Sequence, residues 1–428
     1  MSWRASGRVT RARSQVWLFP PRLVSLYSRN AHVSTGCTMP KSLIEGALSG
    51  TPVPEVNEQD RPKTAEELEI EKIANQLEIC IKLVGCGGAG CNTLNRCIDE
   101  GLGHVQMLAV NTDAKHLLTI KSPKKLLIGK TITRGLGAGA RPEVGERAAM
   151  ENEPEIKEFL KDSQIVFVTA GMGGGTGTAS STVVARIAKE STRALCVGVV
   201  TLPFRSEGEL RMENAMSWLG KLSKICDTTI VIPNDTLIEL VPNLPVQAAF
   251  KVADELLLQT IGGLTEMLTR AGLVNVDYAD LRTILDEGGV SLIGVGSAQG
   301  KPGERIEDAV EEALNSPLLG KIDLNDAKGA LVRVVGGPDM NIEEAANAAE
   351  IITKKIKPEA RLIWGCSVEP EMQGKVRMLL IITGARSQYI LLKDGTEPVI
   401  ARTTEDYAGH VNMPASVHAD EDVSMFVR

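Results

Sequence analysis

The sequence predicts an α/β protein, in which a doubly wound parallel-sheet nucleotide-binding domain is joined by a long central helix to a smaller α+β domain. Three observations predict this fold. Apolar runs alternate with helical stretches from residue 81 to residue 232. Two of these runs lead directly into glycine-rich loops. An apolar helical spacing is then sustained from residue 246 to about residue 270.

The apolar runs are continuous and do not alternate with polar residues. This pattern is typical of strands that are buried on both faces of a parallel sheet. Helices on both faces of that sheet are then the economical arrangement. The predicted strands of this domain are 81–84, 107–110, 126–128, 165–169, 194–201 and 229–232.

The glycine-rich segment after residue 169 is the most informative stretch, because it follows an apolar run and precedes a helical pattern. Glycines have no side chain, so their backbone N–H groups can approach phosphate oxygens, and the helix N-terminus adds its positive dipole end. Threonine hydroxyls add further donors. The residues assigned to this anion site are Gly174, Gly175, Thr176, Gly177 and Thr178.

A second strand, loop and helix pattern lies upstream, with a loop formed by Gly87, Gly88, Ala89, Gly90, Cys91 and Asn92. Alone, this loop satisfies the dinucleotide pattern G-x-G-x-x-G and suggests a nicotinamide or flavin enzyme. The presence of two such loops favours instead a site where both converge on one phosphate chain. Neither loop contains G-x-x-x-x-G-K-[ST], which argues against a P-loop NTPase.

Beyond the long helix, the sequence predicts strands near 291–296, 329–336, 361–368 and 376–383, and helices near 305–315 and 342–356. A capping box at 64–67 opens an acidic helix that runs to about residue 77. The domain plan is an extension and linker without a packed core at 1–62, the nucleotide-binding domain at 63–270, the second domain at 271–385 and a flexible tail at 386–428.

The composition excludes several classes of protein. Apolar residues make up 43% of the 428 residues and the mean hydropathy is -0.01, as in globular proteins. No stretch approaches the roughly 20 apolar residues of a membrane-spanning helix, so direct membrane insertion is not expected. Residues 1–44 carry seven Lys or Arg and no acid, so the net charge of -7 becomes -14 for the remainder. An acidic body argues against nucleic-acid binding.

The eight cysteines are irregularly spaced and form no C-x-x-C pair, so we interpret them as reduced thiols and expect no metal on them. The first 38 residues are rich in Arg and Ser and contain no acid, the composition of an organelle transit peptide. The alternative is upstream sequence that precedes a true start at Met39, and we favour it over organelle targeting.

Several further blocks follow one another in a fixed order: Val110 to Asp113, Gly135 to Ala140, Pro203-Phe204 with Glu207 and Arg211, Ile232 to Asp235, Asn275 to Asp280, and Asn315 to Leu319. With these blocks, the span from about residue 81 to residue 384 resembles the FtsZ family of prokaryotic cell-division GTPases, and its second glycine loop is similar to the tubulin signature. Blocks at 249–255 and 362–365 resemble archaeal members. The resemblance implies a tubulin/FtsZ-type fold that binds GTP and GDP.

The resemblance also implies roles for individual residues around the nucleotide. Asn111 and Asp113 would lie near the phosphates, with Asp113 acting through Mg2+; without the resemblance, Asp113 is a turn residue. Glu207 and Arg211 would lie at the ribose, although their spacing also fits an exposed helical ion pair. The purine would be met by Asn234, Asp254 and Phe250. A carboxylate at Asp254 accepts from guanine N1–H and its exocyclic amine, a donor pair that adenine lacks.

The most mechanistic element is the group Asn275, Asp277 and Asp280. From the residues alone, Asp277 caps a helix beginning at Tyr278, with Asp280 in its favourable first turn. By resemblance, this group is the FtsZ synergy loop, whose carboxylates polarise the attacking water. If they act on the nucleotide of the next subunit, the contacts are head to tail and propagate into a homopolymer.

The resemblance therefore predicts a cytoplasmic GTPase that polymerises at the division site and builds the division ring. Division-machinery or membrane-adaptor proteins are expected partners through the acidic, partly apolar tail at 420–428. Two alternatives stay open: a tubulin-like cytoskeletal GTPase concerned with cell shape, and a nicotinamide-dependent oxidoreductase that uses the first glycine loop.

Overall fold

The computed structural model describes residues 79–102, 105–240, 246–269, 274, 276–286, 288–319 and 324–384, which all belong to one compact unit, Leu77–Arg428. Four predicted features lie outside these residues: the extension at 1–62, the helix at 64–77, the tail at 386–428 and Asn275. The predicted domain boundaries at 62, 270 and 385 do so as well, and they stay predictions.

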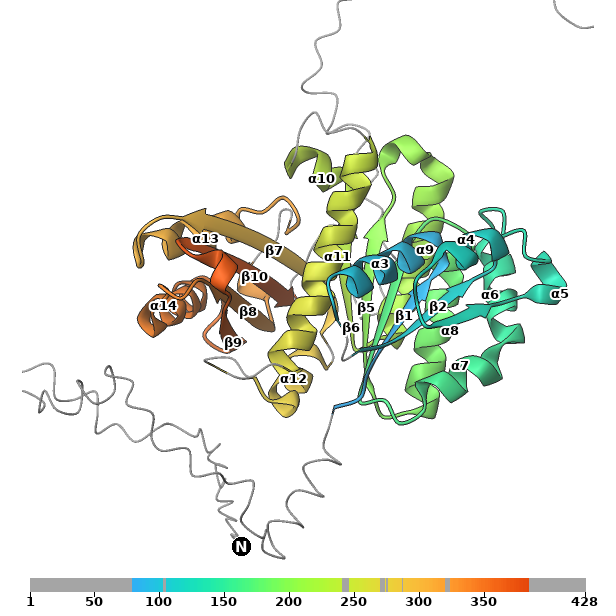
Figure 1. The fold of residues 1–428 in the computed structure, drawn as a ribbon, viewed down its shortest axis with the longest axis horizontal. Coiled ribbons are helices and arrows are strands. Elements are labelled where there is room, and N and C mark those ends of the chain that lie inside the picture. The colour runs from blue at the N-terminus through green and yellow to red at the C-terminus, as the bar shows by residue number, and fades with distance from the viewer. Residues whose placement is uncertain are drawn as a thin grey trace, which may run out of the picture. The chain divides into compact units, whose positions relative to one another are not determined.

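The first half of the described chain forms a parallel sheet in the order β3-β2-β1-β4-β5-β6 (Figure 1). The predicted α/β class is therefore confirmed. The strands are β1 (Ile81–Cys86), β2 (Val105–Asn111), β3 (Lys124–Leu127), β4 (Ile165–Gly171), β5 (Leu195–Leu202) and β6 (Thr228–Pro233). Apart from the edge strand β3, these strands are almost entirely buried, as their continuous apolar runs predict.

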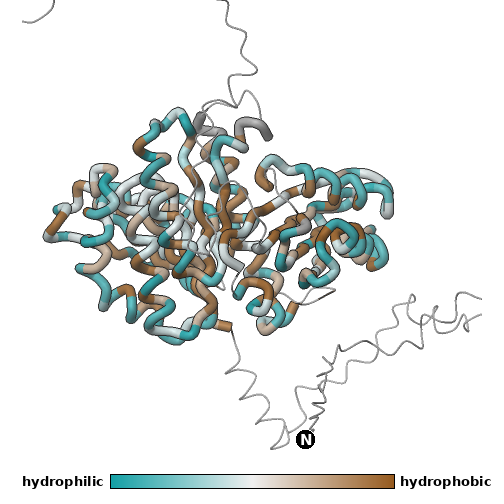
Figure 2. Tube along the Cα trace, turned by 180° about the vertical axis from the view of Figure 1, so that it is seen from behind, coloured by the Kyte–Doolittle hydropathy of each residue, from teal (hydrophilic) through white to brown (hydrophobic). Residues whose placement is uncertain are grey.

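Helices cover both faces of this sheet, because successive side chains of each strand point to opposite sides. Ile81 and Leu83 of β1 pack with α3 (Gly87–Asp99) and α11 (Val246–Thr269). Val84 and Cys86 pack on the other face. There they meet α6 (Pro142–Glu151), α7 (Glu153–Leu160), α8 (Thr176–Ser191) and α9 (Glu209–Ile225). Seen from behind, the apolar segments run through the interior between these layers (Figure 2).

The shorter elements are α4 (Ala114–Thr119), α5 (Lys130–Thr133), η2 (Arg205–Glu207) and α10 (Asn234–Leu240). One predicted boundary differs. The sequence predicts that the first glycine loop extends to Asn92, but α3 already begins at Gly87. The chain turns sharply at Gly87, whose φ of 71° a side chain would disfavour, and enters the helix at once.

The second half of the described chain contains α12 (Tyr278–Leu285), β7 (Gly289–Gln299), α13 (Glu304–Leu314), η3 (Leu324–Asp326), β8 (Gly329–Gly336), α14 (Ile342–Thr353), β9 (Arg361–Val368), η4 (Pro370–Met372) and β10 (Lys375–Thr383). Strand β10 pairs antiparallel with β7 and β8, whereas β8 and β9 are parallel. Helices α13 and α14 pack with these strands in a separate core.

The sheet does not stop between the two halves. Strand β7 pairs with β6 from Thr228 opposite Gly289 to Ile230 opposite Ser291, which gives ten strands in one hydrogen-bonded order. The sequence predicts a parallel-sheet domain joined to a second domain by a helix, and it gives no sign of this strand pairing. Pairing occurs because the edge of β6 would otherwise leave backbone groups without partners. Within the described chain, no helix is both long and apolar enough to cross a membrane.

Candidate functional site

The two glycine loops lie against each other at the carboxyl edge of the parallel strands. A Cβ atom on Gly87 would lie 2.6 Å from the backbone nitrogen of Gly177. A Cβ on Gly90 would lie 2.3 Å from the carbonyl oxygen of Thr169. Both values are far below normal contact distances, so the approach of the loops requires glycine. Two helix N-termini, of α3 and α8, therefore begin side by side and can share one anion.

Within the second loop, the two threonines have different environments. The Thr176 hydroxyl is partly exposed and lies 2.6 Å from the hydroxyl of Thr112 at the end of β2. The Thr178 hydroxyl is fully buried and accepts a 2.8 Å hydrogen bond from the N–H of Gly173. The prediction that Thr178 offers its hydroxyl to a phosphate is not met, because its side chain turns inward and holds the loop. Only its backbone and the Thr176 hydroxyl can face a ligand.

The side chain of Cys91 also turns inward. Its thiol donates to the carbonyl oxygen of Gly85 at 3.5 Å and is fully buried. Burial raises the pKa of the Cys91 thiol to about 12, so the thiol stays neutral. In the first loop, Gly88, Ala89 and Asn92 are exposed. The part of this loop that can meet a ligand is therefore its backbone together with Asn92.

Asn111 is the last residue of β2 and Asp113 follows the strand, and both lie beside the glycine loops. The side-chain oxygen of buried Asn111 accepts from the N–H groups of Thr112 at 2.8 Å and Asp113 at 3.2 Å. One oxygen of Asp113 caps α4 by accepting from the N–H of His116 at 3.0 Å. The turn role that the residues alone suggested for Asp113 is thus present.

A cation site can be tested against these side chains. Among the described residues, no group of three or more His, Cys, Asp or Glu side chains is placed to hold a metal. A single carboxylate beside a phosphate cradle fits Mg2+, which is held mainly by substrate phosphates, water and one or two carboxylates.

A third loop completes the phosphate side of the site, and the sequence alone predicted no role for it. The N–H of Gly137 donates to Thr112, and the N–H of Ala114 donates to Gly135. A Cβ on Gly175 would lie 2.8 Å from the Cβ of Ala138. The signal was the run Gly135 to Ala140, in which the three glycines and Ala140 have positive φ angles.

Glu207 and Arg211 form the i,i+4 ion pair that their spacing suggested. The other oxygen of Glu207 accepts from the N–H of Phe204 at 3.0 Å. A Cβ on Gly173 would lie 2.8 Å from the carbonyl oxygen of Arg211, so the start of α9 lies directly against the second glycine loop. The ion pair therefore borders the site, and the two interpretations of these residues are compatible.

The residues predicted to meet the purine lie on α10 and α11. Asn234 is buried, and its side-chain oxygen has no hydrogen-bond partner in the described part of the chain. Such an atom is costly without a ligand. Phe250 is 43% exposed, and its ring meets Phe204 edge to face at 5.2 Å. An exposed aromatic ring and an unsatisfied polar atom are each suited to a planar base that carries hydrogen-bonding groups.

Asp254 lies on α11, partly buried against α3. Burial raises the pKa of this carboxyl from 3.8 to about 6, although Arg96 and a hydrogen bond with Thr93 act in the opposite direction. A partly desolvated carboxylate gains most from a ligand that brings its own N–H donors. This environment fits the guanine edge that the resemblance implies for Asp254.

Asp277 and Asp280 lie near the amino ends of the parallel strands, opposite the carboxyl ends where the glycine loops lie. Both are exposed at the start of α12, and the carboxylate of Asp277 makes no capping hydrogen bond with the described start of that helix. The hydroxyl of Tyr278 donates to the carbonyl oxygen of Gln164 at 3.1 Å, just before β4 begins. The glycine loop follows the far end of β4, and a seven-residue strand is about 20 Å long. The acids and the loops of one chain therefore cannot meet.

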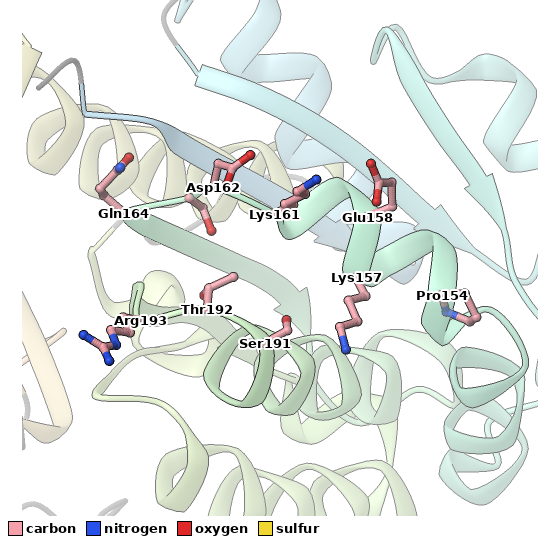
Figure 3. A pocket seen from close by; sticks show the side chains of 10 residues that line it. Pro154, Lys157, Glu158, Lys161, Asp162, Gln164, Ser191, Thr192 and Arg193 are labelled. Carbon is pink, nitrogen blue, oxygen red and sulfur yellow. The ribbon is translucent and has the colours of Figure 1, made fainter. Parts of the chain in front are cut away.

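A hollow of about 670 Å³ opens at this same edge and contains neither the acids nor the glycine loops (Figure 3). It is lined by Pro154, Lys157, Glu158, Lys161, Asp162, Ser163, Gln164, Ser191, Thr192 and Arg193. Because Gln164 is among these residues, the hollow adjoins the anchor of Tyr278 and is separate from the nucleotide edge.

The fold and the site define a GTPase of the tubulin type. Residues 80–242 match the model described as Tubulin/FtsZ family, GTPase domain, so binding of GTP and GDP follows and the nicotinamide alternative loses its support. Residues 289–386 match the model described as FtsZ family, C-terminal domain. The chain belongs to the FtsZ family.

Relatives and solved structures agree with this assignment. Cell division protein FtsZ 1 of Archaeoglobus fulgidus is 47% identical over 83% of this chain and 96% of its own length. FtsZ 1 of Pyrococcus horikoshii is 48% identical over 80% of this chain and 90% of its own. The solved structure of an empty FtsZ dimer from M. jannaschii has a TM-score of 0.70 at 46% identity, covering 75% of this chain and 93% of that one. CetZ1 from Haloferax volcanii, 24% identical with a TM-score of 0.64, shares the fold.

Proposed function

We propose that this FtsZ-family GTPase hydrolyses GTP at a site that two subunits complete, and that the head-to-tail contact assembles the chain into filaments for cell division. The observation that carries this proposal is the position of Asp277 and Asp280 at the sheet edge opposite the glycine loops. A contact between unlike edges is heterologous, and it continues into a filament unless it closes into a ring. The solved M. jannaschii relative is a dimer, which supports self-association.

In this proposal, the backbones of Gly87 to Asn92 and Gly174 to Thr178 hold the phosphates, and Thr176 adds its hydroxyl. Glu207 and Arg211 meet the ribose. Asn234 and Asp254 bind the guanine edge while Phe250 packs on its face. Asp113, with Asn111 beside it, would hold Mg2+, which supplies charge neutralisation at the phosphates when bound.

The acids of the neighbouring subunit would act on the water. Asp277 and Asp280 are exposed, so they can orient a water molecule and accept its proton beside the terminal phosphate of the next subunit. Asn275 is proposed to orient the same water through its amide. Hydrolysis then depends on assembly, and an isolated subunit binds GTP with slow turnover.

The cellular part of the proposal is a division ring at the septum, in the cytoplasm, with adaptor proteins that bind the C-terminal tail. It is supported by the division names of the archaeal relatives. The second candidate, a role in cell shape, shares the same catalytic parts. A tagged copy imaged in dividing cells decides between them. A band at the septum supports the division role, and a signal spread along the whole length of the cell refutes that role.

Mixing two inactive variants tests the shared site. Asp277→Ala keeps an intact nucleotide edge but lacks an acid. Gly88→Asp keeps the acids, and its added carboxylate repels phosphate without disturbing the described fold, since a Cβ there has no neighbour within 4 Å. Each variant alone should hydrolyse GTP slowly. The mixture should exceed the sum of its parts because hybrid contacts pair one variant's GTP with the other's acids.

The control is binding. Asp277→Ala and Asp280→Ala should still be protected by GTP against thermal unfolding, because the ligand stabilises the native state. A mixture that shows only the summed rates, or a dilute monomer with the full rate per subunit, refutes the shared site.

A further inference from the structure

One histidine lies between two asparagines that belong to different phosphate-side elements. His116 is on α4, which follows β2. Its Nε2 atom lies 3.1 Å from Oδ1 of Asn92, on α3. Its Nδ1 atom lies 3.1 Å from Nδ2 of Asn111, at the end of β2. The ring therefore joins the first glycine-loop helix to the loop that carries Asp113.

The surrounding hydrogen bonds determine which ring nitrogen carries the proton. The Oδ1 atom of Asn111 accepts from two backbone N–H groups, so its amide NH2 must face the imidazole. An NH2 group can only donate, and Nδ1 of His116 must therefore accept. The proton is then on Nε2, where it donates to the Asn92 oxygen. A neutral ring with its proton on Nε2 satisfies both contacts.

We propose that His116 is a positioning residue for GTP hydrolysis, which fixes the spacing between the phosphate-binding helix α3 and the Asp113 loop. The inference rests on the proposed function and extends it. Asn92 is exposed, so the bond from His116 restrains a side chain that α3 leaves open to solvent. Asn111 is buried and cannot adjust. The histidine thus holds the phosphate-binding helix α3 at a set distance from the fixed end of β2.

Three substitutions separate the two bonds. His116→Ala removes both. An asparagine places its oxygen near the Nδ1 position, so His116→Asn keeps the acceptor for Asn111. A glutamine reaches further, so His116→Gln keeps the donor to Asn92. Leu118→Ala, on the same helix and 80% exposed, is the matched control, because its side chain reaches neither asparagine.

For His116→Ala we expect a decrease in kcat of about tenfold, the scale of two lost hydrogen bonds. The Kd for GDP should change by less than about threefold. The Mg2+ concentration that gives half-maximal turnover should rise. The Asn and Gln variants should each recover part of the kcat, and the control should match the wild type. Wild-type kcat in His116→Ala, or three variants impaired equally and only in proportion to lost thermal stability, would overturn the proposal.

Nitrogen NMR of histidine-labelled full chain provides a readout that does not need catalysis. The chain has five histidines, and the signals that disappear in His116→Gln identify this one. We expect protonated Nε2 and unprotonated Nδ1, with the pattern altered in Asn111→Ala. A proton on Nδ1 would refute the arrangement. A wild-type chain that showed this pattern but no GTP turnover would refute the proposed function alone.

Discussion

The hydroxyl of Tyr278 donates a 3.1 Å hydrogen bond to the backbone carbonyl of Gln164. This bond ties the helix that carries Asp277 and Asp280 to the chain segment leading into β4, the strand whose other end forms the second glycine loop. The acids of one subunit are thereby held in a fixed relation to its own nucleotide edge. In the proposed filament, that relation would determine which part of the next subunit the acids contact.

Tyr278→Phe should therefore lower assembly-dependent GTP turnover without affecting nucleotide binding. The loss of one exposed hydrogen bond costs at most about 1 kcal/mol, so we expect a decrease in kcat of up to about fivefold. Turnover against subunit concentration and GDP affinity are the measurements. Thr283→Ala, an exposed position on α12, serves as the control. A Tyr278→Phe chain with weaker GDP binding and unchanged kcat would contradict the anchoring role.

Asp254 should make nucleotide affinity depend on pH. Because the pKa of this carboxyl is raised to about 6, mainly by burial, it takes up a proton as the pH falls through that value. A protonated carboxyl loses one acceptor for the two guanine N–H donors, so GDP affinity should fall between pH 7 and pH 5. Titration calorimetry across this range measures it, and Asp254→Asn should give a flat profile.

The stability of the unligated protein should change in the opposite direction. A folded-state pKa above the ordinary value of 3.8 means that the folded state binds the proton more tightly than the unfolded chain. The contribution of Asp254 to stability is therefore fully present below about pH 4 and is lost as the pH rises through about 6. Thermal unfolding without nucleotide should show this loss in the wild type and not in Asp254→Asn.

Two glycines of the first loop should respond differently to alanine. A methyl group at Gly90 would meet the Thr169 carbonyl at 2.3 Å, and overpacking of this kind costs about 1–3 kcal/mol. A methyl group at Gly88 meets none of the described atoms within 4 Å. Gly90→Ala should lower the nucleotide-free melting temperature by several degrees, and Gly88→Ala should change it little. Equal shifts would show that the close approach of α3 to β4 is not required.

A buried charge network should stabilise the second half of the chain. Arg305 is 1% exposed; its Nε and one terminal nitrogen bind Glu344 at 2.7 and 3.0 Å, and the other binds Asp339 at 2.6 Å. Glu344→Gln leaves a buried cation poorly paired, which costs about 3–5 kcal/mol. Glu350→Gln, on the same helix in an exposed i,i+4 pair with Lys354, should destabilise the chain far less, because solvent screens an exposed ion pair. Chemical denaturation measures both values.

Local sequence patterns predicted much of the fold. The continuous apolar runs predicted the six parallel strands within a few residues, and the spacing of apolar residues from 246 predicted α11. They succeed because burial on both sheet faces and on one helix face restricts residue type at every position. The pairing of β6 with β7 was not predictable, since the contact joins segments about 60 residues apart through backbone groups that have no sequence signature.

For the candidate site too, some features could be predicted from the sequence and others could not. The glycines alone predicted the phosphate loops, whereas the roles at the purine and at the attacking water came from the family resemblance, and these roles stay predictions. Only the tertiary structure decided how the side chains are used. It turned Thr178 inward, brought the third loop against Gly175, and placed His116 between Asn92 and Asn111. It also put Asp277 and Asp280 at the edge away from the loops, because the length of β4 separates residues that the linear order leaves unplaced.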